Sequence, residues 1–340
     1  MLATAMPDPS PLPVVGVDLG GTTVKAALVA PGFELGARGQ EPTDLRSQRG
    51  LLDGIERLVE KVRHGTDIGG VGFGLPSQID QRHGRVLDST NIPLEDLDFA
   101  EEMRRRLGAD VMIDNDANVA CLAEWRIGAA KSSDNVVMLT LGTGVGGGLI
   151  LDGRPYRGST GAGAELGHMT IDADGPPCQG HCPNRGCLEV LASATGIMRE
   201  ANTLADARPA GTLREARGGG AVLDARFVIE HARIGDAESL QVLETVGHNL
   251  GIGIANLVNI FNPEMIIFGG TLREVYLASA AQVRGRLNRM CVQAVREHVR
   301  LRTSALGADA ELLGAAELAF ERLLADPLDI ANGPASDPEL

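Results

Sequence analysis

The chain has 340 residues, 44% of them hydrophobic and 22% charged, which is ordinary for a globular protein of one or two domains. Its formal net charge is −14 and it has no basic block. This argues against a nucleic-acid partner, because phosphate backbones are bound by clustered Lys and Arg. The most apolar stretch, 249–270, is interrupted by Asn256, Asn259, Asn262 and Pro263, so we expect no membrane partner.

The hydrophobic pattern predicts strands alternating with helices, which indicates an α/β fold. In chain order, we expect a hairpin at 14–29, a helix at 51–64, a strand at 70–75, a helix at 98–107, a strand at 110–113, a helix at 117–126, a second hairpin at 136–151, a loop at 172–187, a helix at 188–204, a mobile loop at 205–220, a helix at 236–261, a strand at 264–268 and a helix at 312–324.

The two hairpins resemble each other. VVGVDLGGTTVKAALV (14–29) aligns with VVMLTLGTGVGGGLIL (136–151) without a gap, which predicts two related halves. Either glycine turn alone could equally be a tight hairpin, but their repetition favours phosphate binding by backbone N–H groups, with a carboxylate to hold Mg²⁺. The residues expected to bind the nucleotide phosphates and Mg²⁺ are Asp18, Gly20, Gly21, Thr22, Thr23, Thr143 and Gly144.

A polar cluster, Asp114 to Asn118, follows the strand at 110–113. Ligands of open α/β sheets gather at the carboxyl ends of strands. Asp116 is a candidate general base, and Asn115 can both donate hydrogen bonds to a sugar diol and accept them. The competing interpretation, a helix cap, is the usual role of such clusters.

Three cysteines and a histidine form the strongest pattern. Cys178, Cys182 and Cys187 follow His168 at gaps of nine, three and four residues. This is a Cys₃His set for a closed structural Zn²⁺ site, within a loop at 168–187 that is rich in Pro and Gly. The alternative is that the cysteines are simply free and buried. Glu165 and Glu189 flank the cluster as candidate acceptors for sugar hydroxyls.

The chain has five cysteines, an odd number, and its first residues lack the pattern of a signal peptide. We therefore expect a reducing, cytoplasmic environment, with Cys121 and Cys291 as core residues. Residues 1–11 and 327–340 have the composition of disordered ends.

Together these segments resemble the ROK family (repressors, open reading frames, kinases), and within it the bacterial glucokinases. The resemblance runs from about residue 13 to 324. The matching segments are DLGGTT at 18–23, DNDAN at 114–118, LGTGVGGG at 141–148, GAELGH at 163–168, CPNRGCLE at 182–189 and NPEMIIFGG at 262–270.

The resemblance implies an actin-like ATPase (duplicated ribonuclease-H-like) fold with two domains and a central cleft, divided as 12–124 with 305–325 and 125–304. It implies ATP-dependent phosphorylation of a hexose, first of all glucose, with Asp116 as base. Family members are commonly dimers, so a homodimer or homotetramer is expected. The implied sugar-binding residues are Asn91, Asn115, Glu165, His168 and Glu189. The residues implied beside the adenosine are Gly269, Gly270 and Gly314.

Two segments depart from the family pattern. The metal motif is usually Cys-X-Cys-X₄-Cys, whereas here three residues separate Cys178 from Cys182, and His181 within this insertion is a possible substitute ligand. The segment GLPSQID at 74–80 stands where relatives more often read G-x-P-G-P-V-D.

Three alternatives to an ATP-dependent glucokinase follow from the same residues. The acceptor could be N-acetylmannosamine, mannose, fructose or another hexose, because epimers differ by a single hydroxyl. The phosphoryl donor could be polyphosphate or ADP. A sugar-sensing repressor is disfavoured, because seventeen residues before Asp18 are too few for a DNA-binding domain and the net charge is acidic.

Overall fold

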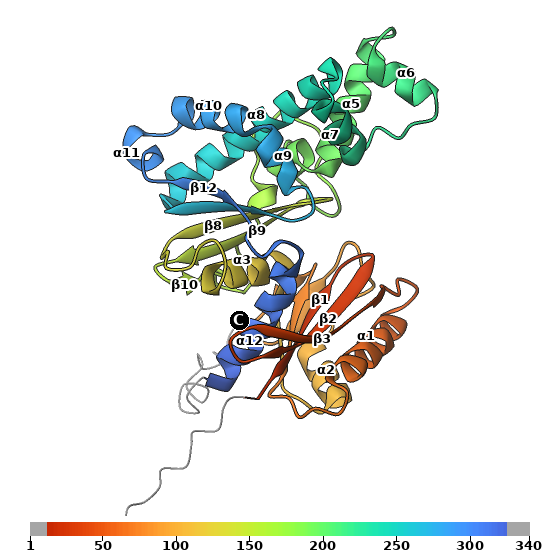
Figure 1. The fold of residues 1–340 in the computed structure, drawn as a ribbon, viewed down its shortest axis with the longest axis vertical. Helices are drawn as coiled ribbons and strands as arrows, with labels where there is room; N and C mark the ends of the chain where they lie inside the picture. The colour runs from red at the N-terminus through yellow and green to blue at the C-terminus, as the bar shows by residue number, and fades with distance from the viewer. Residues whose placement is uncertain (1–11, 325–340) are drawn as a thin grey trace, which may run out of the picture. The chain divides into compact units, whose positions relative to one another are not determined.

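The computed structural model describes residues 12–324 (Figure 1). Its described part divides into two compact units, which we call unit 1 (12–119 and 311–324) and unit 2 (120–310). The domain borders expected from the sequence remain a prediction. The ends expected to be disordered lie outside the described residues.

Unit 1 is built on a five-stranded sheet of order β3-β2-β1-β4-β7. The first three strands are antiparallel, and β4 and β7 run parallel to β1. The strands are β1 (Val14–Leu19), β2 (Thr23–Ala30), β3 (Glu34–Pro42), β4 (Val71–Leu75) and β7 (Val111–Asn115), beside a small hairpin of β5 (Gln78–Asp80) and β6 (Arg85–Asp88).

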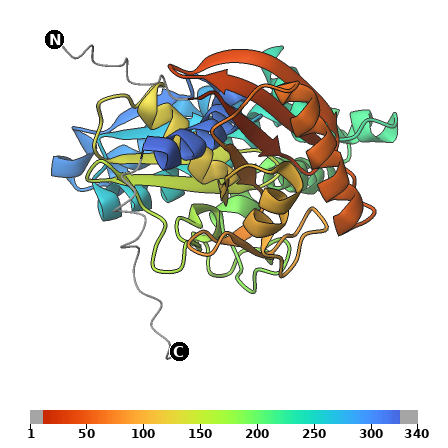
Figure 2. The same ribbon diagram turned by 90° about the horizontal axis from the view of Figure 1, so that it is seen from below.

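Alternation along β1 divides the helices of unit 1 between the two faces of the sheet. Val15 and Val17 belong to the core shared with α1 (Gln48–Arg63) and α2 (Phe99–Leu107), and α1 runs beside the amino-terminal strands (Figure 2). Gly16 faces α12 (Ala310–Leu324), where a Cβ atom would lie only 2.3 Å from the Leu312 carbonyl oxygen.

Unit 2 repeats this arrangement with the order β10-β9-β8-β11-β12. The two parallel pairs are β8–β11 and β11–β12, and β8, β9 and β10 are antiparallel. The strands are β8 (Val136–Leu141), β9 (Val145–Leu151), β10 (Arg154–Pro155), β11 (Met265–Gly269) and β12 (Arg300–Thr303).

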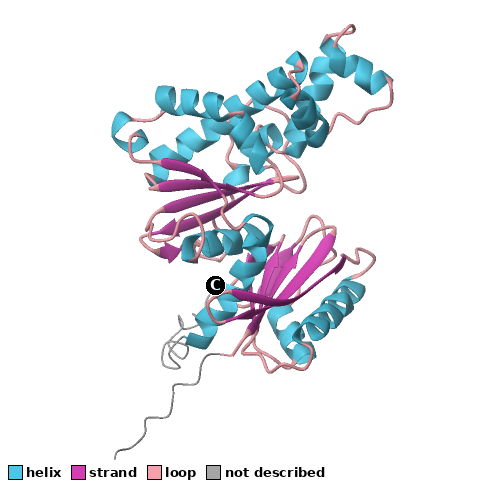
Figure 3. Cartoon of the chain, viewed as in Figure 1, coloured by secondary structure: helices cyan, strands magenta, loops and turns pink. Residues whose placement is uncertain are grey.

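Most helices of unit 2 cover one face of its sheet (Figure 3). Val137 and Phe268 pack on this face against the core that includes α8 (Ala237–Phe261), whereas Met138 and Ile267 face the opposite side with Cys121 of α3 (Asp116–Arg126). The remaining helices are η1 (Leu166–His168), α4 (Leu188–Ala192), α5 (Ala194–Ala207), α6 (Thr212–Gly218), α7 (Ala225–Arg233), α9 (Arg273–Ala278), α10 (Ala280–Met290), α11 (Gln293–Arg296) and η2 (Gly307–Asp309).

The repeat predicted from the two hairpins is present, with one difference. Leu19 pairs with Val24, but Leu141 pairs with Val145, so the second turn is one residue shorter. The gapless alignment is therefore right for β1 and β8 and shifted by one residue for β2 and β9. Glycines 146–148 lie in β9, outside the turn.

The expected helices and strands of unit 1 are confirmed. In α1, the buried residues are those that gave the helical periodicity, namely Leu51, Leu52, Ile55, Leu58, Val59 and Val62. In unit 2, the expected helix at 236–261 and strand at 264–268 correspond to α8 and β11. Cys121 and Cys291 are buried, as predicted.

Two expectations for unit 2 were wrong. The helix expected at 188–204 is broken at Ser193, whose extended backbone ends α4 and whose hydroxyl caps α5. The loop expected at 205–220 contains α6, because Leu213 is buried and its backbone N–H donates to the buried carboxylate of Glu238 at 3.0 Å. A local pattern could not reveal a cap supplied from α8.

Within residues 12–324, none of the helices combines the length and the apolar character that crossing a bilayer would require.

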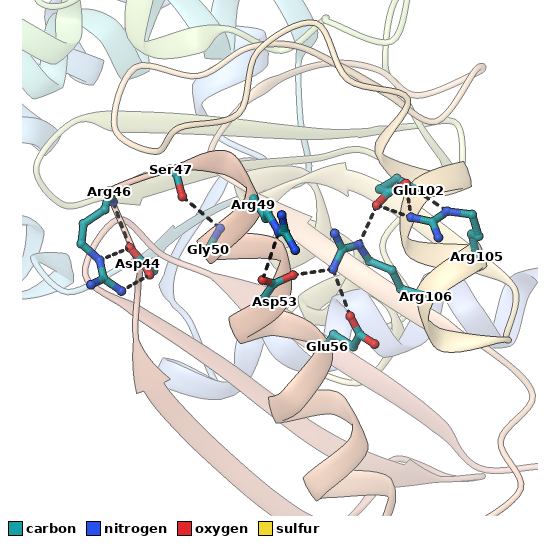
Figure 4. A network of polar contacts seen from close by, with 10 residues as sticks. All are labelled: Asp44, Arg46, Ser47, Arg49, Gly50, Asp53, Glu56, Glu102, Arg105 and Arg106. Carbon is teal, nitrogen blue, oxygen red and sulfur yellow. Dashed lines mark hydrogen bonds and ion pairs between the residues drawn. The ribbon is translucent and has the colours of Figure 1, made fainter.

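A network of ion pairs joins α1 to α2 (Figure 4). The Arg106 guanidinium donates to Asp53 at 2.8 Å, to Glu56 at 3.0 Å and to Glu102 at 2.6 Å. The Arg106 side chain is only 15% exposed, and its pKa is raised by its hydrogen bonds to Asp53 and Glu102. These contacts fix the two helices against each other on the sheet.

We predict that Arg106→Gln lowers the free energy of unfolding by roughly 1–2 kcal/mol, because partly buried, multiply bonded pairs are worth more than exposed ones. Arg49→Gln is the matched control, since Arg49 is 89% exposed and its ion pair with Asp53 spans 3.8 Å. Urea unfolding of both variants is the measurement. Equal losses of stability would contradict the role assigned to Arg106.

Candidate active site

The first glycine turn begins after Asp18 at the end of β1. Asp18 is 8% exposed and lies opposite Lys25 in the strand register, and Lys25 Nζ donates to Asp18 Oδ2 at 2.8 Å. The Gly20 N–H donates to the Thr23 carbonyl oxygen at 3.0 Å and closes the turn. The Thr43 hydroxyl, just after β3, donates to the Gly20 carbonyl oxygen at 2.6 Å and holds the turn from that side. The backbone hydrogen of Gly20 is therefore used by the turn itself.

Asn91 lies beside this turn. A Cβ atom at Gly21 would be 3.5 Å from the Asn91 Cβ, and Asn91 is exposed, as is Thr22. The structure thus brings a residue expected to bind sugar next to residues expected to bind phosphate, within unit 1.

The carboxyl ends of the parallel strands form one edge. Asp18 pairs with Gly74 of β4, and Gly74 pairs with Asp114 of β7. Neighbouring strands lie about 4.8 Å apart, so Asp18 and Asp114 are separated by about 10 Å along this edge.

The cluster after β7 combines helix capping with an exposed carboxylate. Asp114 is 1% exposed and accepts hydrogen bonds from Asn115 N at 2.8 Å and Asn118 Nδ2 at 3.0 Å. Asn115 Oδ1 accepts from Ala117 N at 2.9 Å, which is a helix-capping interaction. Asp116 is the first residue of α3 and is partly exposed. Asp114 is therefore structural, while Asp116 stands at the helix N-terminus, where a negative charge is favoured.

The segment that departs from the family pattern supports Asn115. Ser77 is 6% exposed, and its hydroxyl forms a 2.7 Å hydrogen bond with the Ser89 hydroxyl. The Ser77 carbonyl oxygen accepts from Asn115 Nδ2 at 3.5 Å. This serine thus links the 74–80 segment to the polar cluster.

Glu311 is a functional candidate that the sequence did not reveal. It lies in the first turn of α12. Its backbone and that of Asp116 both approach Gly74: a Cβ atom at Gly74 would be 3.9 Å from the Glu311 carbonyl oxygen and 3.7 Å from the Asp116 Cα. Burial raises the pKa of Glu311 to about 7, and the charges of Asp18 and Asp116 act in the same direction, while Lys25 opposes them. Glu311 is far from Asp18 and Asp116 in the sequence, so the sequence pattern could not show that they lie close together.

In unit 2, the second glycine turn is held by the α4–α5 segment. The Val145 N–H donates to Glu189 Oε2 at 3.0 Å, and Ala194 N donates to the Gly142 carbonyl oxygen at 3.0 Å. A Cβ atom at Gly144 would be 2.2 Å from Glu189 Oε2, so a larger residue there would displace the Glu189 carboxylate. Glu189, expected to bind sugar, therefore also supports the turn that contains Thr143.

Gly269 and Gly270 lie beside this turn at the end of β11. Gly270 has φ +78°, and a Cβ atom there would be 2.3 Å from the Leu141 carbonyl oxygen. The structure thus brings together the residues of unit 2 that are expected to bind the nucleotide, namely Thr143, Gly144, Gly269 and Gly270. Gly314 belongs to unit 1, where a Cβ atom would be 1.7 Å from the Val119 carbonyl oxygen, so close packing of α12 on α3 already accounts for this glycine.

His168, Cys178, Cys182 and Cys187 converge, with one potential ligand atom from each lying within 4.8 Å of the others. The Sγ atoms of Cys182 and Cys187 are 4.0 Å apart, and Cys178 Sγ is 3.5 Å from His168 Nδ1. Tetrahedral Zn²⁺ with ordinary bond lengths would separate two sulfurs by about 3.8 Å and a sulfur from an imidazole nitrogen by about 3.6 Å. The donor set and its spacing fit zinc. Among the described residues, the convergent group contains Cys178 and not His181.

Glu165 lies next to His168, one of the four residues of this cluster. His168 Nε2 is 3.9 Å from Glu165 Oε2, so the imidazole directs one nitrogen to the cysteines and the other to Glu165. Glu165 is 51% exposed, yet desolvation by the surrounding protein raises its pKa, the His168 charge lowers it and the Glu189 charge raises it. A Cβ atom at Gly167 would be 2.0 Å from the Val145 carbonyl oxygen, which fixes η1 against β9.

The order and register of its two sheets give the chain the actin-like ATPase fold, in which a ribonuclease-H-like unit occurs twice. The ROK family model matches residues 14–322, and the chain therefore belongs to the ROK family.

The chain is 34% identical over 316 residues to a glucokinase of Thermotoga maritima (92% of this chain and 98% of that protein). It is 33% identical over 307 residues to a glucokinase of Halalkalibacterium halodurans (88% and 92%). A crystal structure of a ROK glucokinase of Streptomyces griseus with glucose and AMPPNP superimposes with a TM-score of 0.79 at 31% identity (91% and 99%).

We predict that Glu311 makes the stability depend on pH. The folded state retains this proton up to a pKa of about 7, whereas the unfolded state releases it near 4.5, so the folded state binds more protons in between. Its contribution is thus fully present below pH 4.5 and lost as the pH rises through 7. At 1.36 kcal/mol per pH unit, the loss is on the order of 3 kcal/mol.

Glu311→Gln should remove this dependence. Urea unfolding at pH 5 and pH 8 should show that the variant gains stability relative to wild type at the higher pH, and Glu95→Gln, an exposed carboxyl of the same unit, is the control. A difference between wild type and Glu311→Gln that is independent of pH would refute the assignment.

Proposed function

We propose that this chain is an ATP-dependent hexose kinase whose preferred acceptor is glucose, which it converts to glucose 6-phosphate. The support is the similarity to glucokinases over about nine tenths of the chain, together with a carboxylate, Asp116, at the carboxyl end of a parallel strand. The proposal includes a cytoplasmic location, where cysteine ligands stay reduced, and assembly as a homodimer or homotetramer.

Asp116 acts as the general base in this proposal. Its carboxylate takes the proton from the 6-hydroxyl as that oxygen attacks the γ-phosphorus. The bond from the γ-phosphorus to the bridging oxygen breaks, and ADP leaves with the electron pair. Asp116 stands at a helix N-terminus, where the negative charge of a base is favoured.

The other expected residues bind and orient the substrates. Asn91 and Asn115 of unit 1, and Glu165, His168 and Glu189 of unit 2, are assigned to sugar hydroxyls. Asp18 is assigned to Mg²⁺, directly or through water, and that ion supplies charge stabilisation to the transferring phosphoryl group. The residues assigned to the nucleotide are Gly20, Gly21, Thr22, Thr23, Thr143, Gly144, Gly269, Gly270 and Gly314.

We assign a structural Zn²⁺ to His168, Cys178, Cys182 and Cys187, since four protein ligands leave no coordination position for a catalytic water. The ion orders the loop that carries Glu165 and His168 on one side and Glu189 on the other. The residues that it holds, and not the ion, contact the sugar.

We predict that Asp116→Asn lowers kcat by about 10²–10⁴-fold, the usual contribution of a general base, while glucose affinity is largely kept. A coupled assay with a panel of hexoses and with ATP, ADP and polyphosphate measures this, and calorimetry measures glucose binding. If N-acetylmannosamine or mannose were the preferred substrate, the proposed acceptor would change and the proposed kinase reaction would stand. Lack of turnover of any hexose with every donor would exclude the kinase and favour a sugar-sensing regulator.

For the metal, we predict about one zinc per chain by elemental analysis. Cys187→Ser should lose the ion and lower the Tm, because thiolate–zinc bonds order a loop with little core of its own. Cys291→Ser is the matched control, since Cys291 is buried outside the cluster and should leave the zinc content unchanged. Full zinc content in Cys187→Ser would contradict the ligand assignment.

A further inference from the structure

Glu189 contacts the second glycine turn directly, and it is also one of the residues assigned to the sugar. Its Oε2 atom accepts from the Val145 N–H at 3.0 Å. A Cβ atom at Gly144 would be 2.2 Å from this oxygen, 3.0 Å from Glu189 Cδ and 3.7 Å from Glu189 Cγ, so the outer part of the side chain lies along the turn. Thr143 and Gly144, which are expected to bind the donor phosphates, come directly before the residue that Glu189 holds.

The same carboxylate is close to the other residues assigned to the sugar in unit 2. The charge of Glu189 raises the pKa of Glu165, and Glu165 Oε2 lies 3.9 Å from His168 Nε2. A carboxylate has two oxygens with about four acceptor positions, so Oε1 can accept from a sugar hydroxyl while Oε2 keeps the Val145 N–H. The two contacts therefore do not compete for one atom.

The backbone of Glu189 is anchored in unit 2. Leu188, the residue before it, is fully buried, and the Ser193 N–H donates to the Glu189 carbonyl oxygen at 3.0 Å. The Ala194 N–H holds the other end of the turn through the Gly142 carbonyl oxygen at 3.0 Å. The Glu189 carboxylate is thus the part of this connection that a substitution can move without unfolding α4.

We propose that Glu189 is shared by the two substrates, because it positions the second glycine turn for the phosphoryl donor while it binds the sugar acceptor. This rests on the proposed function, in which that turn binds ATP and Glu189 binds the hexose. It goes beyond that assignment, since a sugar residue then also sets the affinity for the donor, and a change in the donor turn reaches the sugar. The hydrogen bond from the Val145 N–H is direct, so the connection needs no intermediate residue.

Gly144→Ala tests the connection from the donor side. The backbone of Gly144 lies outside the left-handed region and accepts alanine, and the added Cβ atom meets the outer end of a flexible side chain. The fold should therefore persist, while the Glu189 carboxylate is pushed off the turn and out of its position for the sugar. We expect the Kd for glucose, measured by calorimetry without nucleotide, to rise about tenfold, as for the loss of a hydrogen bond to a charged group.

Gly142→Ala is the matched control for this variant. Gly142 lies in the same turn and also outside the left-handed region, but a Cβ atom there would be 3.7 Å from Thr271 Oγ1, which is an ordinary contact distance. Its affinity for glucose should equal that of wild type. The urea unfolding curves of both alanine variants should match the wild-type curve.

Glu189→Asp tests the connection from the sugar side. Aspartate keeps the charge but is one methylene shorter, so its carboxylate no longer reaches the Val145 N–H. We expect the Kd for AMPPNP, measured without sugar, to rise about three- to tenfold, as for the loss of one hydrogen bond. Glu165→Asp is the matched control, since it shortens the neighbouring carboxylate, which lies beside His168, and it should leave the affinity for AMPPNP unchanged.

The possible failures are distinguishable. If wild type phosphorylates no hexose with any donor, the proposed function fails. If wild type is active, unchanged glucose affinity in Gly144→Ala or unchanged AMPPNP affinity in Glu189→Asp overturns the shared role of Glu189. An equal loss in either matched control also overturns it, because the effect would then come from a general disturbance of the turn or of the sugar site.

Discussion

Close approach of backbone segments at glycine is the constraint on which both units depend. In unit 1, α12 crosses the sheet so closely that a Cβ atom at Gly72 would be 1.8 Å from the Ala315 carbonyl oxygen. In unit 2, η1 meets β9 at Gly167 with similarly little space. Gly16, Gly72 and Gly167, which a reading along the chain does not distinguish from the glycines of ligand-binding turns, serve this packing. It brings Glu311 to the edge that carries Asp18, and His168 and Glu165 to the start of β9.

The loop at 168–187, which we propose binds a metal, illustrates how such packing becomes a site. Its cysteines and His168 converge at distances that suit a tetrahedral ion, and two glutamates near them in sequence contact different groups. Glu165 faces His168, and Glu189 accepts a hydrogen bond from the second glycine turn. A loop with little core can position polar groups only if something rigid fixes it, and the proposed thiolate-bound ion would supply that rigidity. The Cys₃His cluster and the second glycine turn, separate in the sequence, are thus connected within unit 2 through Glu189.

Much of the fold could be predicted. The helical spacing of its apolar residues predicted α1, because only one side of that helix is buried. The two similar hairpins predicted the duplicated architecture. The errors arose where a distant group intervened. The α6 segment looked like a loop until Glu238 of α8 supplied its cap, and the second turn lost one residue that a gapless alignment could not detect.

The sequence by itself determined the family, the two-unit α/β architecture and the residues from which the candidate metal cluster is drawn, because these depend on residue types at short, fixed spacings; the choice of Cys178 over His181 came from the structure. Only the tertiary structure decided which neighbour each polar group meets. Asp114 became a buried acceptor for the Asn115 N–H and the Asn118 amide, and Asp116 a partly exposed carboxylate, although only Asn115 separates them on the chain. Glu311 and Ser77 gained their polar neighbours because strands and helices distant in sequence end at the same place. Hydrogen bonds and charges act over a few ångströms of space, and sequence separation does not measure that distance.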